Sequence, residues 1–227
     1  MKYDHIFLDS DNTLLDFDKA QEGAFADLLA RYGVLYTDGL YARYSELNHG
    51  YWKRFEQGSI TKAKLCSERF EVFFGELGIS VEGVEADRFY QSALSNQYQH
   101  MPYAEEVCQA LQSRGKLTVV TNGVGTTALS RLKGSGLDKY MAHIVVSELV
   151  GHNKPSREFF DAAFEIAECK PSDKIIIIGD SLSSDIRGGI NAGIDTCWYN
   201  PKGAAAPEDM EITYIITDLR QLLDIIE

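Results

Sequence analysis

Short apolar segments that end in polar residues dominate the organisation of this 227-residue chain. They are rich in β-branched residues and show no strict alternation of apolar and polar positions, which is typical of strands buried on both faces of a parallel sheet. There are six such segments: residues 5–11, 117–123, 143–148, 174–181, 195–200 and 213–217. Each is expected to place its polar residues at the carboxyl end of a strand.

Helical patterns lie between these segments. Residues 104–115 form one of them. We expect Gly115 to end this helix as its C′ residue, in the left-handed conformation. A second contains apolar residues at helical spacing, namely Phe159, Phe160, Ala163, Phe164 and Ala167. Strands and helices in alternation predict an α/β fold with a doubly wound parallel sheet.

Residues 18–100 interrupt this alternation, because they contain no convincing buried strand. Four sets of apolar residues at helical spacing predict a bundle of four helices inserted after the first strand. The sets are Phe25, Leu28, Leu29 and Tyr32; Leu40, Tyr44, Leu47, Tyr51 and Phe55; Cys66, Phe70, Phe73 and Leu77; and Phe89, Ala93, Leu94 and Tyr98. We therefore expect a core domain of residues 1–17 and 101–227 and a helical domain of residues 18–100.

Composition narrows the class of protein. The net charge of −12, without any local run of Lys and Arg, argues against binding to nucleic acid. The four cysteines form no metal-ligand pair and favour a reducing cytoplasm. The charged first residues lead us to expect no signal sequence, and we see no segment long enough to span a membrane. Residues 201–211 are the best candidate for an exposed loop. We expect no membrane association and no obligate protein partner.

The polar residues that follow the predicted strands form the candidate site. Taken singly, each of them has an ordinary explanation as a turn residue, a helix cap or a solvated lysine. The carboxyl ends of parallel strands converge, however, so these residues are expected to line one crevice. They are Asp9 and Asp11; Thr121, Asn122 and Gly123; Lys154; and Asp180 with Asp185.

Two halves with complementary chemistry would meet in that crevice. Its carboxylates offer the hard oxygen ligands that Mg²⁺ prefers. The Thr121 hydroxyl, the backbone N–H groups near Asn122 and Gly123, and the Lys154 ammonium offer donors and positive charge. A phosphoryl group needs both halves, since its oxygens bind cations and donors while its phosphorus needs an in-line nucleophile.

The same residues resemble the four motifs of the haloacid dehalogenase (HAD) superfamily. The motifs are D-S-D-N-T at 9–13, V-T-N-G at 120–123, N-K-P at 153–155 and G-D-S-x3-D-I-x-G-G at 179–189. The resemblance spans the whole chain. It implies a HAD-like Rossmannoid core, and it implies that the helical insertion is a cap domain of the C1 type.

The resemblance also implies a role for each residue. Asp9 would be the nucleophile that forms an aspartyl-phosphate, and Asp11 would act as general acid and then as general base. Thr121, Asn122 and Gly123 would bind the phosphoryl oxygens, with Lys154 neutralising charge. Mg²⁺ would be held by Asp9, by Asp180 and by the backbone carbonyl of Asp11, with Asp185 acting through water or from outside the ligand shell.

The motifs favour phosphoryl transfer over the reaction that names the superfamily. The dehalogenase branch displaces halide without a metal and lacks an acid two residues after its nucleophile, whereas this chain has Asp11. One departure from many relatives is Asn12, which occupies a position where they carry glycine. Asn12 could alter the turn around the nucleophile but removes no catalytic group.

The substrate is predicted from residues outside the four motifs. NHGYWKRFEQGSITKAKL (48–65), SELVGHNKP and GGINAGIDTCWYNP resemble bacterial house-cleaning 5′-nucleotidases that act on pyrimidine nucleoside monophosphates, although His152 and Asn153 differ from their pattern. In this interpretation Tyr51, Trp52 or Phe55 would stack on a base, unless they only pack the cap. Sugar phosphates, phosphoglycolate and phosphate transfer within a mutase are alternatives with the same mechanism. A receiver-like phospho-acceptor module is a more distant one.

Overall fold

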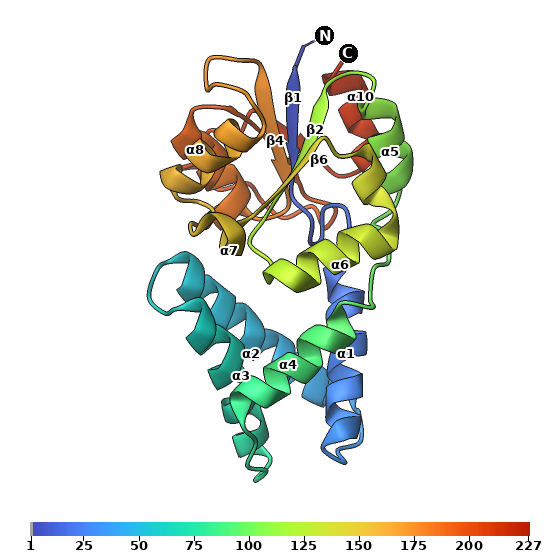
Figure 1. Ribbon diagram of the computed structural model, residues 1–227, viewed down its shortest axis with the longest axis vertical. Helices are drawn as coiled ribbons and strands as arrows, with labels where there is room; N and C mark the ends of the chain where they lie inside the picture. The colour runs from blue at the N-terminus through green and yellow to red at the C-terminus, as the bar shows by residue number, and fades with distance from the viewer. Residues whose placement is uncertain (1) are drawn as a thin grey trace. The chain divides into compact units, whose positions relative to one another are not determined.

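A computed structural model describes the structure of residues 2–227 (Figure 1). The chain divides into two compact units. The first comprises the residues up to Phe17 together with Tyr98–Glu227, and the second is Asp18–Gln97. Each unit has its own packed interior.

A six-stranded sheet forms the centre of the first unit. In the order of the sheet the strands are β3 (His143–Val146), β2 (Lys116–Thr121), β1 (His5–Leu8), β4 (Ile175–Gly179), β5 (Asp195–Tyr199) and β6 (Tyr214–Ile216). All neighbouring strands run parallel, and Leu8 is aligned with Val119 on one side and Ile178 on the other. The strand order reverses between β1 and β4, which confirms the predicted doubly wound fold.

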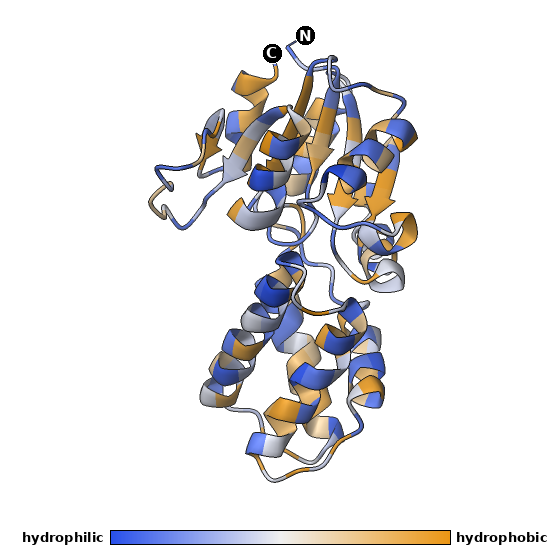
Figure 2. Ribbon diagram, turned by 90° about the vertical axis from the view of Figure 1, so that its left-hand side faces the viewer, coloured by the Kyte–Doolittle hydropathy of each residue, from blue (hydrophilic) through white to orange (hydrophobic). Residues whose placement is uncertain are grey.

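Both faces of this sheet are buried, as the continuous apolar runs predict. Ile6 and Leu8 belong to the cluster beneath α5 (Ala104–Leu111) and α10 (Leu222–Ile225), while Phe7 belongs to the cluster beneath α8 (Arg157–Ile166). The strands accordingly form the most apolar part of this unit in Figure 2. The remaining α-helices of the unit are α6 (Gly125–Ser135), α7 (Ser147–Val150) and α9 (Arg187–Ala192), and Leu137–Tyr140 and Leu219–Gln221 form short 3₁₀ helices.

The predicted end of helix α5 at Gly115 is wrong. The helix ends at Leu111, and the chain then turns through residues 112–115, with the Gly115 N–H donating to the Leu111 carbonyl. Gly115 does not adopt a left-handed conformation. It is favoured for a different reason, because a Cβ at this position would lie 3.2 Å from the backbone oxygens of both Tyr3 and Asp4, a closer approach than most Cβ atoms make.

The second unit consists of four helices, as the four apolar sets predict. They are α1 (Phe17–Arg31), α2 (Asp38–Glu56), α3 (Lys62–Glu76) and α4 (Gly83–Leu94). Thr37 and Thr61 cap α2 and α3, since each hydroxyl accepts a hydrogen bond from a backbone N–H three residues later. Aromatic rings fill the interior, with Phe25 stacked on Tyr44 at a centroid distance of 4.3 Å.

The buried face of α4 differs from the predicted one. Ala86, Tyr90 and Leu94 are buried, whereas Phe89 is only half-buried and Tyr98 lies beyond the helix and is exposed. Tyr90 takes the interior position because its ring packs against Phe70 and Tyr44. Spacing alone fits both sets, and it is the contact with the neighbouring helices that selects one of them.

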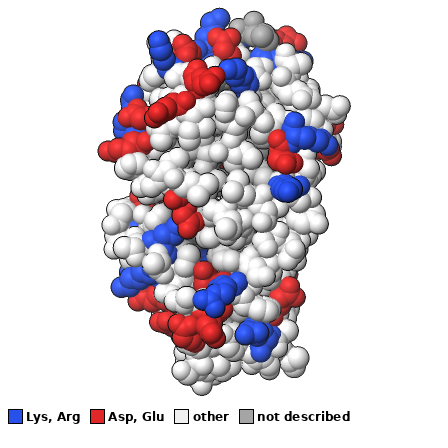
Figure 3. Space-filling view, viewed as in Figure 1, with Lys and Arg blue, Asp and Glu red and all other residues white. Residues whose placement is uncertain are grey.

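The surface and the helices can be compared with the predictions made from composition. Residues 201–211 form the expected exposed loop, without helix or strand. On the face drawn in Figure 3, basic and acidic side chains are intermixed. Within residues 2–227, no helix combines the length and the apolar character needed to cross a bilayer.

Candidate active site

Three carboxylates converge beyond the carboxyl ends of β1 and β4. Asp9 follows β1, Asp180 follows β4, and Asp185 lies in a π-helical turn, Leu182–Ile186. One carboxylate oxygen from each lies within 4.8 Å of the other two. Asp9 and Asp185 are buried and Asp180 is half-buried. This cluster stands at the point where the strand order reverses, which is where ligands bind in open α/β sheets.

The ammonium of Lys154 joins this cluster to the neighbouring strand. Its Nζ donates to Asp9 Oδ1 and Asp185 Oδ1, each at 2.6 Å, and to the backbone oxygen of Val120 at 2.7 Å. All three N–H donors of the ammonium are therefore used. The side chain is 1% exposed, so Lys154 is a buried charge that depends on these partners.

The charges within the cluster do not balance. Burial raises the pKa of Asp9 to about 7, an effect that Lys154 opposes and that Asp185 and Asp11 reinforce. Burial, with Asp9 and Asp185 nearby, also raises the pKa of Asp180 well above its usual range. For Lys154 burial acts against the charged form, but Asp185 and Asp9 outweigh it and raise the pKa. A set of oxygen ligands with excess negative charge fits a divalent cation such as Mg²⁺.

Local backbone features bring Asp185 into the cluster. A Cβ on Gly179 would overlap the Asp185 carboxyl group, so glycine at the last position of β4 is what admits it. Asp185 Oδ2 also accepts a hydrogen bond from the Ser181 N–H at 3.1 Å. The Trp198 indole N–H donates to the Asp180 backbone oxygen at 2.8 Å. This hydrogen bond links the residue that follows β4 to the neighbouring strand β5.

The segment Thr121–Gly123 follows β2 and lies beside Lys154. The Asn122 amide is bonded at both ends to the Lys154 backbone: its Nδ2 donates to the carbonyl, and its Oδ1 accepts from the N–H, both at 2.9 Å. This side chain therefore links two loops. The Thr121 hydroxyl accepts from the Gly123 N–H at 3.0 Å. At the start of α6, the Gly125 N–H donates to Glu148 at 2.6 Å.

Asp11 lies apart from the three clustered carboxylates. Its Oδ1 accepts a hydrogen bond from Nη1 of Arg131, a buried residue of α6, while about a third of its side chain, 31%, is exposed. The next residue, Asn12, has a positive φ of 58°, a conformation that asparagine tolerates, and its Oδ1 accepts from the Phe17 N–H at 2.9 Å. The sequence motifs did not point to Arg131. Its place on the buried face of α6, with Thr127, Ala128 and Leu132, is the signal that could have found it.

Comparison with known proteins agrees with this arrangement. The family model of haloacid dehalogenase-like hydrolases matches residues 3–193. The chain belongs to this family. It is a hydrolase, and the predicted HAD resemblance is confirmed.

Relatives of this HAD-like hydrolase match it along almost the whole chain. It is 35% identical to the HAD-hydrolase YfnB of Bacillus subtilis, over 99% of this chain and 96% of YfnB. It is 33% identical to the pyrimidine 5′-nucleotidase YjjG of Escherichia coli, over 98% and 97% of the two chains. It is 34% identical to the pyrimidine 5′-nucleotidase PynA of Streptococcus pneumoniae, over 100% of this chain and 96% of PynA. A crystal structure of YfnB bound to magnesium superposes with a TM-score of 0.94, 34% identity and full coverage of both chains.

The aromatic residues considered for base stacking lie in the second unit of the hydrolase. Tyr51 and Phe55 are buried with Leu65 in an apolar cluster of the helical bundle. Trp52 is half-buried, and its ring meets Phe55 edge to face at 5.8 Å. Tyr51 and Phe55 therefore have packing roles, which leaves Trp52 as the most accessible of the three.

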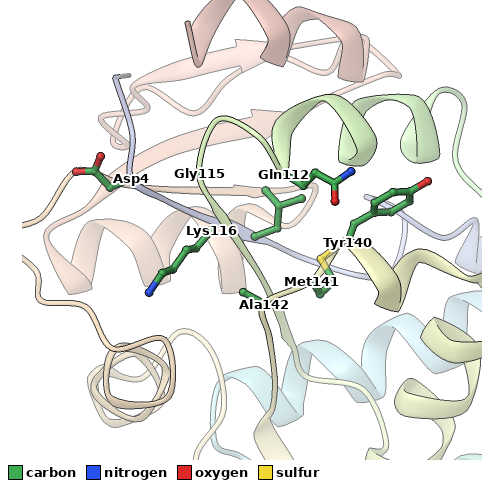
Figure 4. Close-up of a pocket in the computed structure, with 8 residues that line it drawn as sticks. Asp4, Gln112, Gly115, Lys116, Tyr140, Met141 and Ala142 are labelled. Atoms are coloured by element: carbon green, nitrogen blue, oxygen red, sulfur yellow. The ribbon is translucent and has the colours of Figure 1, made fainter.

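A groove at the opposite end of the sheet carries no comparable chemistry. It has a volume of about 460 Å³ and lies at the amino ends of the strands, where Asp4, Lys116 and Ala142 are found (Figure 4). The rest of its wall consists of Gln112, Gly115, Leu117, Tyr140 and Met141. Its charged residues, Asp4 and Lys116, are few and separated, in contrast to the acidic cluster.

Proposed function

We propose that this hydrolase is a Mg²⁺-dependent phosphomonoesterase that forms an aspartyl-phosphate and acts on pyrimidine nucleoside 5′-monophosphates. The observation that carries the mechanism is the Lys154 ammonium, which contacts Asp9 and Asp185 at 2.6 Å beside the Thr121–Gly123 segment. A carboxylate can attack an anionic phosphate only where positive charge offsets their repulsion. Lys154 supplies part of that charge.

The first step forms one bond and breaks another. A carboxylate oxygen of Asp9 attacks phosphorus, and the bond from phosphorus to the ester oxygen breaks as Asp11 gives that oxygen a proton. The alcohol leaves, and phosphate remains on Asp9. Water then attacks the phosphorus, Asp11 takes its proton, and inorganic phosphate is released with the Asp9 carboxylate restored.

The remaining residues bind and orient the phosphoryl group. The Thr121 hydroxyl and the backbone N–H of Asn122 donate to its oxygens, since the Asn122 side chain is occupied by the Lys154 backbone. The Gly123 N–H joins them by giving up its hydrogen bond to the Thr121 hydroxyl. Asp9, Asp180 and the Asp11 backbone carbonyl would hold Mg²⁺, with Asp185 behind them. The bound metal would neutralise phosphoryl charge. We place the enzyme in the cytoplasm, in keeping with four cysteines that form no disulfide in the described part of the chain.

The proposed substrate class is supported by the two nucleotidase relatives, which match along the full chain. Sugar phosphates and phosphoglycolate remain the alternatives, since the core residues act on the phosphoryl group alone. Halide displacement is disfavoured by Asp11, which supplies the acid that a phosphate ester needs.

A phosphate-release screen tests the proposal. We expect turnover of uridine and thymidine 5′-monophosphates in Mg²⁺, with sugar phosphates and phosphoglycolate slower. Asp9→Asn should abolish turnover while circular dichroism stays unchanged, and chelation by EDTA should stop it reversibly. A preference for sugar phosphates would overturn the substrate class and keep the mechanism. Turnover by Asp9→Asn, or undiminished turnover in EDTA, would overturn the mechanism.

A further inference from the structure

We infer that Arg131 is a positioning residue for Asp11: it binds one carboxylate oxygen and thereby directs the other toward the phosphoryl-binding segment. The inference rests on the proposed function and adds a residue that the four sequence motifs do not contain. The hydrogen bond from Arg131 Nη1 to Asp11 Oδ1 is the contact on which the inference is built.

The two oxygens of Asp11 have different surroundings. Oδ1 accepts the hydrogen bond from Arg131 Nη1. Oδ2 points toward Gly123, since a Cβ built on that glycine would lie 3.8 Å from Oδ2 and 3.2 Å from the Thr121 hydroxyl. One carboxylate oxygen is therefore tied to α6, while the other faces the place where the ester oxygen is expected.

The chemistry of guanidinium decides which oxygen carries the proton. Arginine has five N–H donors and no acceptor, so the oxygen that it binds must itself be an acceptor. When Asp11 acts as the acid, the proton that it donates is therefore the one on Oδ2. In the first step this proton moves from Oδ2 to the ester oxygen as the bond to phosphorus breaks. In the second step Oδ2 takes a proton from the attacking water.

Arg131 is a charged residue in an interior position. Arg131 lies on the buried face of α6 and its side chain is 2% exposed. Burying a guanidinium is unfavourable unless a charged partner accepts its hydrogen bonds. The ring of Phe17 lies 5.5 Å from the guanidinium carbon and helps to fix the plane of the group. A rigid, planar donor suits the task of orienting a carboxylate.

Substrates with different leaving groups test this role. An alkoxide needs a proton in order to leave, as in uridine 5′-monophosphate, whereas p-nitrophenolate leaves without one. Arg131→Met should therefore lower kcat/KM for the nucleotide by roughly tenfold to hundredfold, part of the roughly 10²–10⁴ that general acid catalysis supplies. The value for p-nitrophenyl phosphate should change far less. Arg131→Lys, which keeps a cation, should recover part of the loss.

Controls separate this role from a structural one. Arg114→Met removes another arginine of the same unit, whose Nη1 donates to the Leu223 backbone oxygen at 2.5 Å, and should leave the ratio between the two substrates unchanged. Equal losses for both substrates in Arg131→Met, or no loss, would overturn the inference. If Arg131→Met does not fold, the same ratio measured in Arg131→Lys and Arg131→Gln decides.

Two further results distinguish a failure of the proposed function from a failure of the inference about Arg131. A wild-type enzyme that hydrolyses no phosphate ester would overturn the proposed function. A crystal structure of Arg131→Met then still tests the positioning, since we expect the Asp11 carboxylate to turn away from Gly123. An unchanged Asp11 in that crystal structure would overturn the inference on its own.

Discussion

At the scale of single residues, Lys154 determines how much negative charge the site can hold. Its ammonium satisfies Asp9, Asp185 and the Val120 carbonyl at once, all of them in the interior. Removing one partner of a buried ion pair leaves the other charge without compensation, which costs more than the intact pair ever contributes. Lys154 is therefore expected to matter for stability as well as for catalysis.

Lys154→Met should lower the free energy of unfolding by about 3–5 kcal/mol in metal-free buffer at pH 8. The loss should shrink toward pH 5. Burial already raises the pKa of Asp9 to about 7 in the presence of Lys154, and the variant lacks the cation that opposes this effect. A folded state with the higher pKa binds more protons, so the variant gains stability as the pH falls. Urea unfolding at the two pH values measures the difference.

A surface lysine provides the matched control for this measurement. Lys139 pairs with Glu105 at 2.9 Å, but both side chains are about half exposed, so Lys139→Met should change stability far less and without the same pH dependence. An equal loss in the two variants, or a Lys154→Met deficit that grows on acidification, would contradict the role given to the buried ammonium.

Single residues were predictable where a strand end identified them. Asp9, Asp180 and Asp185 do converge, and Lys154 does reach Asp9 and Asp185, because parallel strands bring their carboxyl ends together. Arg131 was not predictable from strand ends, since it lies inside a helix and is paired by tertiary contact alone. The contact of the Asn122 side chain with the Lys154 backbone was likewise hidden, because sequence does not show which loop faces which.

At the scale of elements, the end of β4 and the turn after it together determine where Asp185 lies. Gly179 closes the strand, and the π-helical turn Leu182–Ile186 returns Asp185 to the space that the missing Cβ leaves. Strand and turn therefore hold Asp180 and Asp185 in the cluster together. A side chain at Gly179 would compete with Asp185 for the same volume.

Gly179→Ala should displace the Asp185 carboxyl group and break its contact with Lys154. We expect lost phosphatase activity, weaker Mg²⁺ binding by calorimetry and a stability loss of about 1–3 kcal/mol from overpacking. Gly50→Ala is the control, because Gly50 lies within α2 and a Cβ there meets nothing within 4 Å. That variant should gain about 0.5–1 kcal/mol. Full activity in Gly179→Ala would show that Asp185 does not need this space.

The position of a helix or strand could be predicted where the residues of that element alone determine it. The apolar runs located all six strands, since burial on both faces leaves a continuous signal. The end of α5 and the buried face of α4 depend on neighbours. A Cβ at Gly115 would crowd the carbonyls of Tyr3 and Asp4, which favours glycine there. Tyr90 is buried because its ring packs against the rings of Phe70 and Tyr44. No pattern within either helix contains that information.

At the scale of the whole molecule, the chain leaves the first unit and returns to it through two adjacent segments. The Asp16 N–H donates to the Gln99 carbonyl at 2.8 Å, and the Met101 N–H donates to the Leu14 carbonyl at 2.9 Å, so the two segments run side by side in opposite directions. Both segments belong to the first unit up to Phe17 and from Tyr98. A short connection could therefore replace everything between them.

Replacing residues 18–97 by a short glycine–serine linker should leave a folded first unit, because its sheet has apolar clusters on both faces that use no residue of the second unit. If the second unit is the cap that selects substrates, the shortened protein should still hydrolyse p-nitrophenyl phosphate in Mg²⁺ but lose its preference among nucleotides. The same replacement carrying Asp9→Asn is the control and should be inactive. A shortened protein that folds, as judged by circular dichroism and a cooperative melt, yet keeps the nucleotide preference of the full chain would place specificity in the first unit. The resemblance of residues 48–65 to nucleotidases would then have no bearing on substrate choice.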